Sequence, residues 1–231
     1  MRALFLFLVL LLPASVSGQE ARPVNCRFLR FGGSDDSASV LALSSKGAEA
    51  TCPLSTSSLS APIVCFAAEN KIAFLSAGDR KPAATATIPG HVKSAILVFV
   101  QAPRAAESAS STPLPWRILV IEDSPKNFPD GGAFVANFHD TDIRFIVGEH
   151  KGMLHPAGNH GYAMPAERDA FNMAPVMFEF QQGEKWRTAN ESTLRFLPGM
   201  RYLIIAYTDP ASGRPRISTC QDFTAPAPLV P

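Results

Sequence analysis

The chain has almost no net charge, because it contains 21 Lys and Arg residues against 20 Asp and Glu residues. It also lacks any block of clustered Lys or Arg. Binding to nucleic acid and adhesion to anionic membranes both depend on such clusters. The composition therefore argues against both classes of partner.

Signature motifs of catalysis are missing as well. The chain has no Gly-x-Ser-x-Gly elbow, no His-Glu-x-x-His helix, no Walker loop and no dinucleotide-binding glycine signature. A hydrolase built from scattered Ser, His and Asp residues stays open as an alternative, since catalytic triads are defined by geometry rather than by sequence order. We predict that the protein is not an enzyme.

Cysteine is scarce, and none of the four cysteines forms a Cys-x-x-Cys pair. This argues against a thioredoxin-like redox site and against a zinc ribbon. An even number of cysteines in an exported chain favours disulfides. Cys52 and Cys65 flank the loop PLSTSSLSAPIV and are the pair expected first, which leaves Cys26 to pair with Cys220. Free buried thiols are the alternative.

Residues 1–18 have the pattern of a secretory signal peptide. A positive residue, Arg2, precedes an apolar core, and small residues lead to a cleavage site before Gln19. The apolar core is too short to span a bilayer, and no later segment approaches about 18 uninterrupted apolar residues. We therefore expect a periplasmic or extracellular protein without stable membrane insertion after cleavage. A retained N-terminal anchor is the alternative.

Short strand patterns separated by Gly and Pro turns fill the rest of the chain, and no segment has a clear helical period. Two long apolar runs, Ser94 to Gln101 and Arg201 to Thr208, each follow a Pro-Gly turn. Both predict long strands, and the unbroken run in Ser94 to Gln101 indicates either burial on both faces or a central position in the sheet. Val176 to Gln181 alternates instead, which is typical of a strand with one buried face.

A stiff joint divides the chain. The segment SPKNFPDGG after Asp123 has two prolines and two glycines. It cannot lie inside a sheet, because proline lacks a ladder donor and glycine has no side chain to pack. We predict an N-terminal sandwich at 19–123, a joint at 124–131, a C-terminal sandwich at 132–222 and a disordered tail at 223–231.

The two halves resemble one another. TATIPGHVKSAILVFVQAP matches TLRFLPGMRYLIIAYTDP, and the closing strands WRILVIED and PRISTCQD both end in a polar-acidic pair. The hairpins VCFAAENKIAF and MFEFQQGEKWR are assigned to equivalent positions. About seven short strands in each half fit the immunoglobulin-like sandwich. The predicted fold is all-β, with two tandem immunoglobulin-like antiparallel β-sandwich domains; one larger β-sandwich is the alternative.

The joint also carries a resemblance. IEDSPKNFPDGGAFVANF, at 121–138, resembles a family of uncharacterised secreted bacterial β-sandwich proteins that share an Asp-Ser/Asp-x-x-x-Phe-Pro-x-Gly joint before an Arg/Phe-Val-x-Asn strand. The resemblance continues to RYLIIAYTD, but Asn137-Phe138-His139 stands where the family pattern continues Asn-x-Ser. It implies export and a β-rich fold, and no known activity.

The densest group of possible metal ligands lies in MLHPAGNHGYAM and comprises Met153, His155, His160 and Met164. Thioether and imidazole donors together favour copper. Against this, the spacing from His155 to His160 across Pro-Ala-Gly-Asn forms no regular ligand face. Structural loop histidines are the alternative.

These patterns predict an exported, non-catalytic binding or structural module of the cell envelope or extracellular space that needs no cofactor. Its partner is expected to be an unknown protein or glycan of the envelope. Binding of copper or another transition metal through the loop 150–164 is the alternative function.

Overall fold

The structure is a computed structural model that describes residues 21–31, 38–43, 49–101 and 114–223. The predicted signal peptide at 1–18 lies outside the described residues, as does the predicted tail beyond Phe223. No helix occurs in the described part of the chain, where all regular structure is strand. The all-β prediction is confirmed.

The N-terminal half contains the strands β1 (Arg22–Phe31), β2 (Ser39–Leu43), β3 (Glu49–Pro53), β4 (Ile63–Ala67), β5 (Lys71–Ser76), β6 (Pro82–Thr87), β7 (Ser94–Gln101) and β8 (Trp116–Glu122). The C-terminal half contains β9 (Ala133–Asn137), β10 (Ile143–Val147), β11 (His150–Leu154), β12 (Asn159–Tyr162), β13 (Met173–Gln182), β14 (Lys185–Arg195), β15 (Met200–Thr208) and β16 (Pro215–Phe223).

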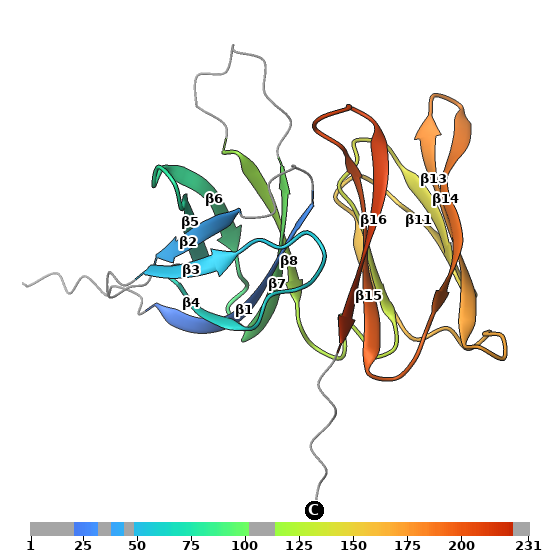
Figure 1. Cartoon of the computed structure of the whole chain (residues 1–231), viewed down its shortest axis with the longest axis horizontal. Helices are drawn as coiled ribbons and strands as arrows, with labels where there is room; N and C mark the ends of the chain where they lie inside the picture. Colours follow the sequence, from blue (N-terminus) through green and yellow to red (C-terminus); the bar gives the residue numbers. More distant parts are fainter. Residues whose placement is uncertain (1–20, 32–37, 44–48, 102–113, 224–231) are drawn as a thin grey trace, which may run out of the picture.

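Each half folds into two four-stranded sheets that face one another (Figure 1). Sheet A has the order β4-β1-β7-β8 and sheet B the order β3-β2-β5-β6. Sheet C has the order β12-β9-β15-β16 and sheet D the order β11-β10-β13-β14. Sheets A and B enclose one apolar core, and sheets C and D enclose another. The prediction of two tandem β-sandwich domains is confirmed.

The two domains share one topology. Strands β9 to β16 take the same places in sheets C and D as β1 to β8 take in sheets A and B. Both domains also contain a parallel pair at the same place, β1 with β7 and β9 with β15. The equivalence of the two Pro-Gly segments and of the two closing strands agrees with this topology.

The proposed equivalence of the hairpins is wrong. VCFAAENKIAF forms the β4–β5 connection, whereas MFEFQQGEKWR forms the β13–β14 hairpin. The topological counterpart of β13–β14 is β5–β6. Two hairpins can look alike in sequence because local alternation does not record which sheet each strand joins.

The strand arrangement differs in detail from the immunoglobulin pattern. Immunoglobulin domains place their first two strands in one sheet, whereas β1 and β2 lie in different sheets here. The parallel pairs also make sheets A and C mixed rather than wholly antiparallel. Both pairs lie at strands covered on both faces, where residue alternation gives no signal of strand direction.

The outer face of sheet A packs on the outer face of sheet C, so the domains share a third apolar layer. This interface layer consists of Leu29, Phe31, Ile96, Val98, Val100, Ile121, Phe128, Phe134, Ala136, Leu203, Ile205, Tyr207 and Cys220. Strands β7 and β15 are therefore covered on both faces and almost wholly buried. For β7 this agrees with the burial predicted from its continuous apolar run.

Neither predicted disulfide is present, because all four cysteines are buried free thiols. The Cys26–Cys220 pairing is wrong for a geometric reason. Cys26 lies in the core between sheets A and B, while Cys220 lies in the interface layer on the other side of sheet A. Cys52 shares the core with Cys26 and Cys65.

Candidate functional site

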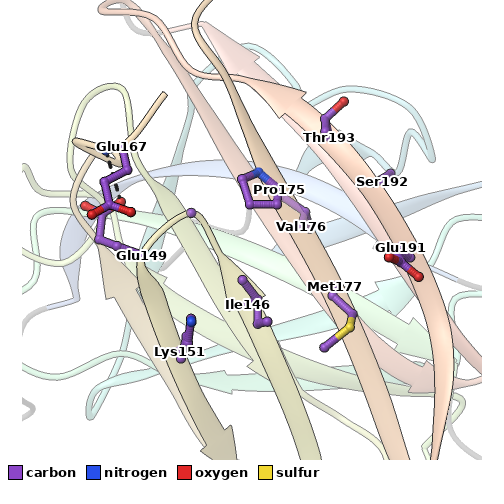
Figure 2. A pocket seen from close by; sticks show the side chains of 11 residues that line it. Ile146, Glu149, Lys151, Glu167, Pro175, Val176, Met177, Glu191, Ser192 and Thr193 are labelled. Carbon is purple, nitrogen blue, oxygen red and sulfur yellow. Dashed lines mark hydrogen bonds between the residues drawn. The ribbon is translucent and has the colours of Figure 1, made fainter. Parts of the chain in front are cut away.

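A groove of about 810 Å³ crosses the outer face of sheet D (Figure 2). One cross-strand row crosses it, with Ile146 and Met177 as its floor and a charged residue at each end: Lys151, Ile146, Met177 and Glu191 stand side by side on β11, β10, β13 and β14. Pro175, paired with Thr193 on β14, extends the groove along β13. The hollow is thus built by all four strands of the sheet.

Alternation along β13 explains why these side chains reach the groove. Val176, Phe178 and Phe180 point into the C-terminal core. Successive residues of a strand point to opposite faces, so Met177 between them faces outward and is only half-buried. The same alternation on β10 leaves Ile146 half-buried on the outer face. The groove therefore has an apolar floor.

A turn tied to a neighbouring loop forms one end of the groove. The Glu149 carboxylate accepts hydrogen bonds from the backbone N–H of Ala166 at 2.8 Å and of Glu167 at 3.4 Å. These backbone hydrogen bonds lower the pKa of Glu149, so the group stays ionised. Gly148 adopts a φ of 61° and approaches Pro165 where a side chain would collide. These contacts hold this end of the groove in place.

Beyond the groove, the same face of sheet D carries an aromatic and cationic pair. The Arg144 guanidinium lies 4.2 Å from the centre of the Trp186 ring. Its Nε donates a hydrogen bond of 3.0 Å to Glu179. The adjacent Met153 is 48% exposed. Arg, Trp and Met are residue types enriched in protein interfaces, so the face offers more than the groove for a partner to contact.

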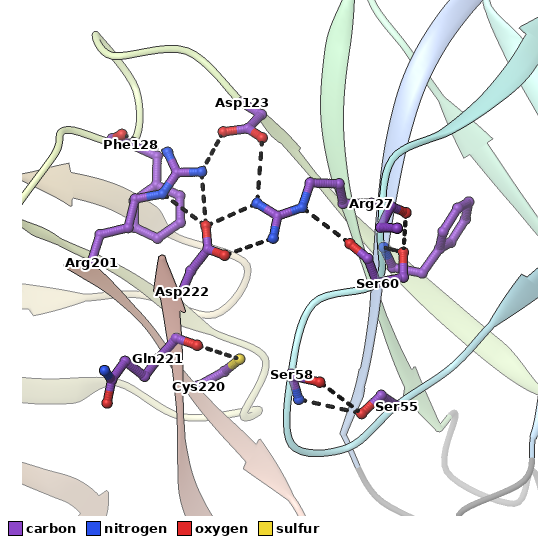
Figure 3. Close-up of polar contacts among 12 residues, drawn as sticks. Arg27, Ser55, Ser58, Ser60, Asp123, Phe128, Arg201, Cys220, Gln221 and Asp222 are labelled. Atoms are coloured by element: carbon purple, nitrogen blue, oxygen red, sulfur yellow. Dashed lines mark hydrogen bonds and ion pairs between the residues drawn. The ribbon is translucent and has the colours of Figure 1, made fainter. Parts of the chain in front are cut away.

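Charged side chains continue the interface layer at one end of the domain contact (Figure 3). Arg27 of β1 donates two hydrogen bonds to the Asp222 carboxylate of β16, at 2.9 and 2.7 Å. Arg201 of β15 donates to Asp222 at 3.0 Å and to Asp123 at 2.7 Å. The four side chains form the interdomain ion cluster, which joins the two domains.

Burial alone would lower the pKa of Arg27, but the hydrogen bond and the charge of Asp222 outweigh it and the net pKa is raised. Arg201 has further partners: its guanidinium donates to the Phe128 carbonyl at 3.0 Å and lies 4.0 Å from the Phe128 ring centre. The cluster is therefore well hydrogen-bonded, as a buried set of charges must be.

A second hollow of about 430 Å³ lies at the joint between the domains. His91 and Glu122 come from the N-terminal domain, Asn127 from the joint and His160 from β12. The Asn127 amide donates to Glu122 at 2.6 Å, and His91 lies 3.8 Å from the same carboxylate. Glu122 thus serves mainly to hold the joint.

The structure does not bring the predicted copper ligands together. Met153 lies on β11 in sheet D, and His160 lies on β12 in sheet C with its ring 4.8 Å from Tyr162. His155 is hydrogen-bonded to the Asp142 carboxylate at 2.9 Å, and Met164 packs against the C-terminal core.

The segment treated as the loop 150–164 is therefore largely two strands that join different sheets. Among the described residues, no group of three or more His, Cys, Asp or Glu side chains is placed to hold a metal ion.

His139 is the one buried histidine among the described residues, and its environment favours the neutral ring. Its Nδ1 accepts a hydrogen bond of 3.1 Å from the Thr141 backbone N–H, and its ring lies 4.8 Å from Phe180. Burial lowers the pKa of His139 from 6.5, although nearby Asp140 opposes the shift. The folded protein thus resists protonation at this position.

We expect stability to fall as pH drops below about 6.5, because the unfolded chain then binds a proton that folded His139 rejects. His139→Asn keeps a hydrogen-bond acceptor but does not titrate there. Urea denaturation at pH 7 and pH 5 should show a smaller loss of stability for the variant than for the wild type. Equal losses in both proteins would contradict this role.

Sequence reasoning missed the ion cluster and the groove. A signal for part of the cluster was present, since Arg201 is the one charged residue in the apolar strand β15, whereas β1 holds other polar residues besides Arg27. Alternation places both arginines with Leu29 and Leu203 on the interface side. The groove had no comparable signal, because it depends on which strands lie side by side.

Comparison with known proteins gives no relationship: no protein-family model matches the chain, and no curated protein matches it. Among the residues that the structure describes, no helix meets the length and hydropathy needed to cross a membrane.

Proposed function

We propose that the protein is an exported, non-catalytic binding module that recognises a protein or glycan of the cell envelope through the outer face of sheet D. The observation that carries this proposal is the groove itself. Its apolar floor, Ile146 and Met177, is bordered by the charged groups Glu149, Lys151 and Glu191. Ligand sites commonly combine an apolar surface with a few placed polar groups.

The domain interface supports the same proposal. An apolar layer and the interdomain ion cluster connect sheets A and C. Interfaces of this kind hold two domains in one relative orientation. The N-terminal domain then acts as a rigid support, and the face of sheet D farthest from the interface points away from it (Figure 1).

Export is part of this proposal and rests on the sequence. The signal-peptide pattern of residues 1–18 and the resemblance of the joint segment 121–138 to secreted bacterial β-sandwich proteins both favour it. The proposed site would then face the periplasm or the extracellular space. Absence of catalytic signatures favours binding over chemistry.

The two related domains provide a matched test. Met177→Lys places a charge in the groove floor on β13, and Ala73→Lys places the same charge on the exposed face of β5. Strands β13 and β5 hold equivalent central positions in sheets D and B. Each variant and the wild type, as residues 19–231, would be immobilised and exposed to envelope protein and envelope polysaccharide fractions.

We expect the wild type and Ala73→Lys to retain one common ligand, and Met177→Lys to lose at least about tenfold in affinity because a ligand seated in the groove would desolvate the charged lysine. Circular dichroism should be the same for all three proteins. Equal retention by both variants, or retention of no ligand by the wild type, would refute the assignment of this face.

A further inference from the structure

Three of the four cysteines meet in the core of the N-terminal domain. Cys26 on β1 is paired with Ile63, and Cys65 on β4 is paired with Val24, in one antiparallel register. The two cysteines are therefore diagonal neighbours on the inner face of sheet A. Cys52 on β3 reaches the same core from sheet B, and none of the three is more than 1% exposed.

Cys65 occupies the middle of this group. Its thiol interacts with that of Cys52 and with that of Cys26. Cys220 is not part of the group, since its Sγ lies 3.8 Å from the carbonyl oxygen of Ser57 at the domain interface. Cys65 therefore has two possible disulfide partners, whereas each member of an ordinary cysteine pair has one.

We propose that Cys26, Cys52 and Cys65 form a redox site in which Cys65 is the shared partner of two mutually exclusive disulfides. The Cys52–Cys65 bond would join sheet B to sheet A, and the Cys26–Cys65 bond would link two neighbouring strands of sheet A. Because Cys65 has one sulfur, only one bond exists at a time. The remaining cysteine of the group and Cys220 stay reduced.

The oxidant is a low-molecular-weight disulfide such as oxidised glutathione. Cys65 releases its proton to solvent, and the thiolate attacks one sulfur of the oxidant, whose disulfide bond breaks and releases one glutathione. The thiolate of Cys52 or Cys26 then attacks Cys65 Sγ and releases the second glutathione. Two protein thiols are oxidised, two protons leave them, and one glutathione disulfide is reduced to two thiols.

Burial of the thiols determines when the disulfide forms. Hydrogen bonding to Cys26, together with burial, raises the pKa of Cys65 to about 12. Thiolate is the reactive form, so the folded, reduced domain resists oxidation and the bond forms while the chain is still folding. The third thiol beside the bond provides a route for exchange between the two pairings.

Peptide mapping of the mature chain tests the proposal. Residues 19–231 would be refolded with reduced and oxidised glutathione, alkylated at low pH and digested without reductant. In the wild type we expect one disulfide that contains Cys65, with two of the four thiols alkylated. Cys26→Ala should contain only Cys52–Cys65, and Cys52→Ala should contain only Cys26–Cys65. Cys65→Ala should have no disulfide.

A Cys220→Ala variant is the matched control and should leave the map of the wild type unchanged. A Cys26–Cys52 bond, any bond to Cys220, or alkylation of all four thiols in the wild type would overturn the proposal. The wild-type map decides this without any substitution, so a variant that folds poorly does not prevent the test. Circular dichroism of each reduced protein reports whether it has folded.

Discussion

Replacing Asp222 with Ala is expected to lower the free energy of unfolding by about 3–5 kcal/mol, because a buried charge pair that loses one member leaves the other uncompensated. The Asp222 side chain is only 3% exposed and accepts hydrogen bonds from both Arg27 and Arg201. Asp123, 2.7 Å from Arg201 and 4.0 Å from Arg27, would then be the one carboxylate of the cluster left to balance two guanidinium groups. Urea denaturation at neutral pH measures the loss.

The two tryptophans can report on each domain separately, since Trp116 lies on β8 and Trp186 on β14. In single-tryptophan versions of the wild type, we expect the two unfolding transitions to coincide. In Asp222→Ala they should separate, because the contact between the domains is weakened. Asp222→Asn keeps the shape of the side chain and should lose less stability.

The surface carboxylate Asp79, which pairs with Lys81, is the control for Asp222. Both of these side chains are largely exposed, and exposed pairs contribute little. Asp79→Ala should therefore unfold at the same urea concentration as the wild type. If Asp222→Ala also unfolds there, the ion cluster has no part in holding the domains together.

Gly161→Ala should also be strongly destabilising. A Cβ atom at Gly161 would collide with the backbone carbonyl oxygen of Asn127 in the joint, and backbone cannot move aside as a flexible side chain can. Either β12 or the joint must shift, and such overpacking costs about 1–3 kcal/mol. Thermal and urea denaturation would measure the effect, and hydrogen exchange should show faster opening of β12.

Gly90→Ala is the matched substitution, because Gly90 lies between Pro89 and His91, which line the same hollow at the joint as Gly161. The nearest atom to a Cβ there is the side-chain oxygen of Asn70 at 3.6 Å, which is ordinary contact. This variant should be as stable as the wild type or slightly more so. Similar destabilisation of both variants would show that loss of glycine flexibility, rather than collision with the joint, is responsible.

Periodicity was sufficient to predict much of the fold. Strand patterns bounded by Gly and Pro turns predicted an all-β chain, and the Pro-rich segment at 124–131 predicted a division into two sandwiches. The continuous apolar run of β7 predicted burial on both faces or a central position, and the third apolar layer accounts for its burial. These predictions succeeded because residue polarity records whether each face of a strand meets water.

The candidate sites were less accessible to sequence reasoning. The donors in 150–164 are close in sequence, but β11 and β12 carry them into sheets D and C. Conversely, Lys151, Ile146, Met177 and Glu191 are far apart in sequence and form one row. Nearness along the chain predicted a site that the strand pairing disperses, and it gave no indication of the groove.

Cysteine pairing illustrates the same limit. The even number of cysteines and the short loop between Cys52 and Cys65 favoured that pair, and assigned Cys26 to Cys220 by elimination. Side-chain direction on β1 turns Cys26 into the N-terminal core, while β16 places Cys220 on the far side of sheet A. Counting cysteines cannot detect a sheet that lies between two of them.

The sequence by itself determined that the chain is β-rich, that it forms two sandwiches and that the run Ser94 to Gln101 is deeply buried. Those properties depend on the polarity of each residue and its immediate neighbours. Only the tertiary structure decided that β1 pairs in parallel with β7, that sheet A packs on sheet C, and that Arg27 meets Asp222. Strand partners are chosen by packing between segments distant in sequence, and local alternation is the same whichever partner a strand takes.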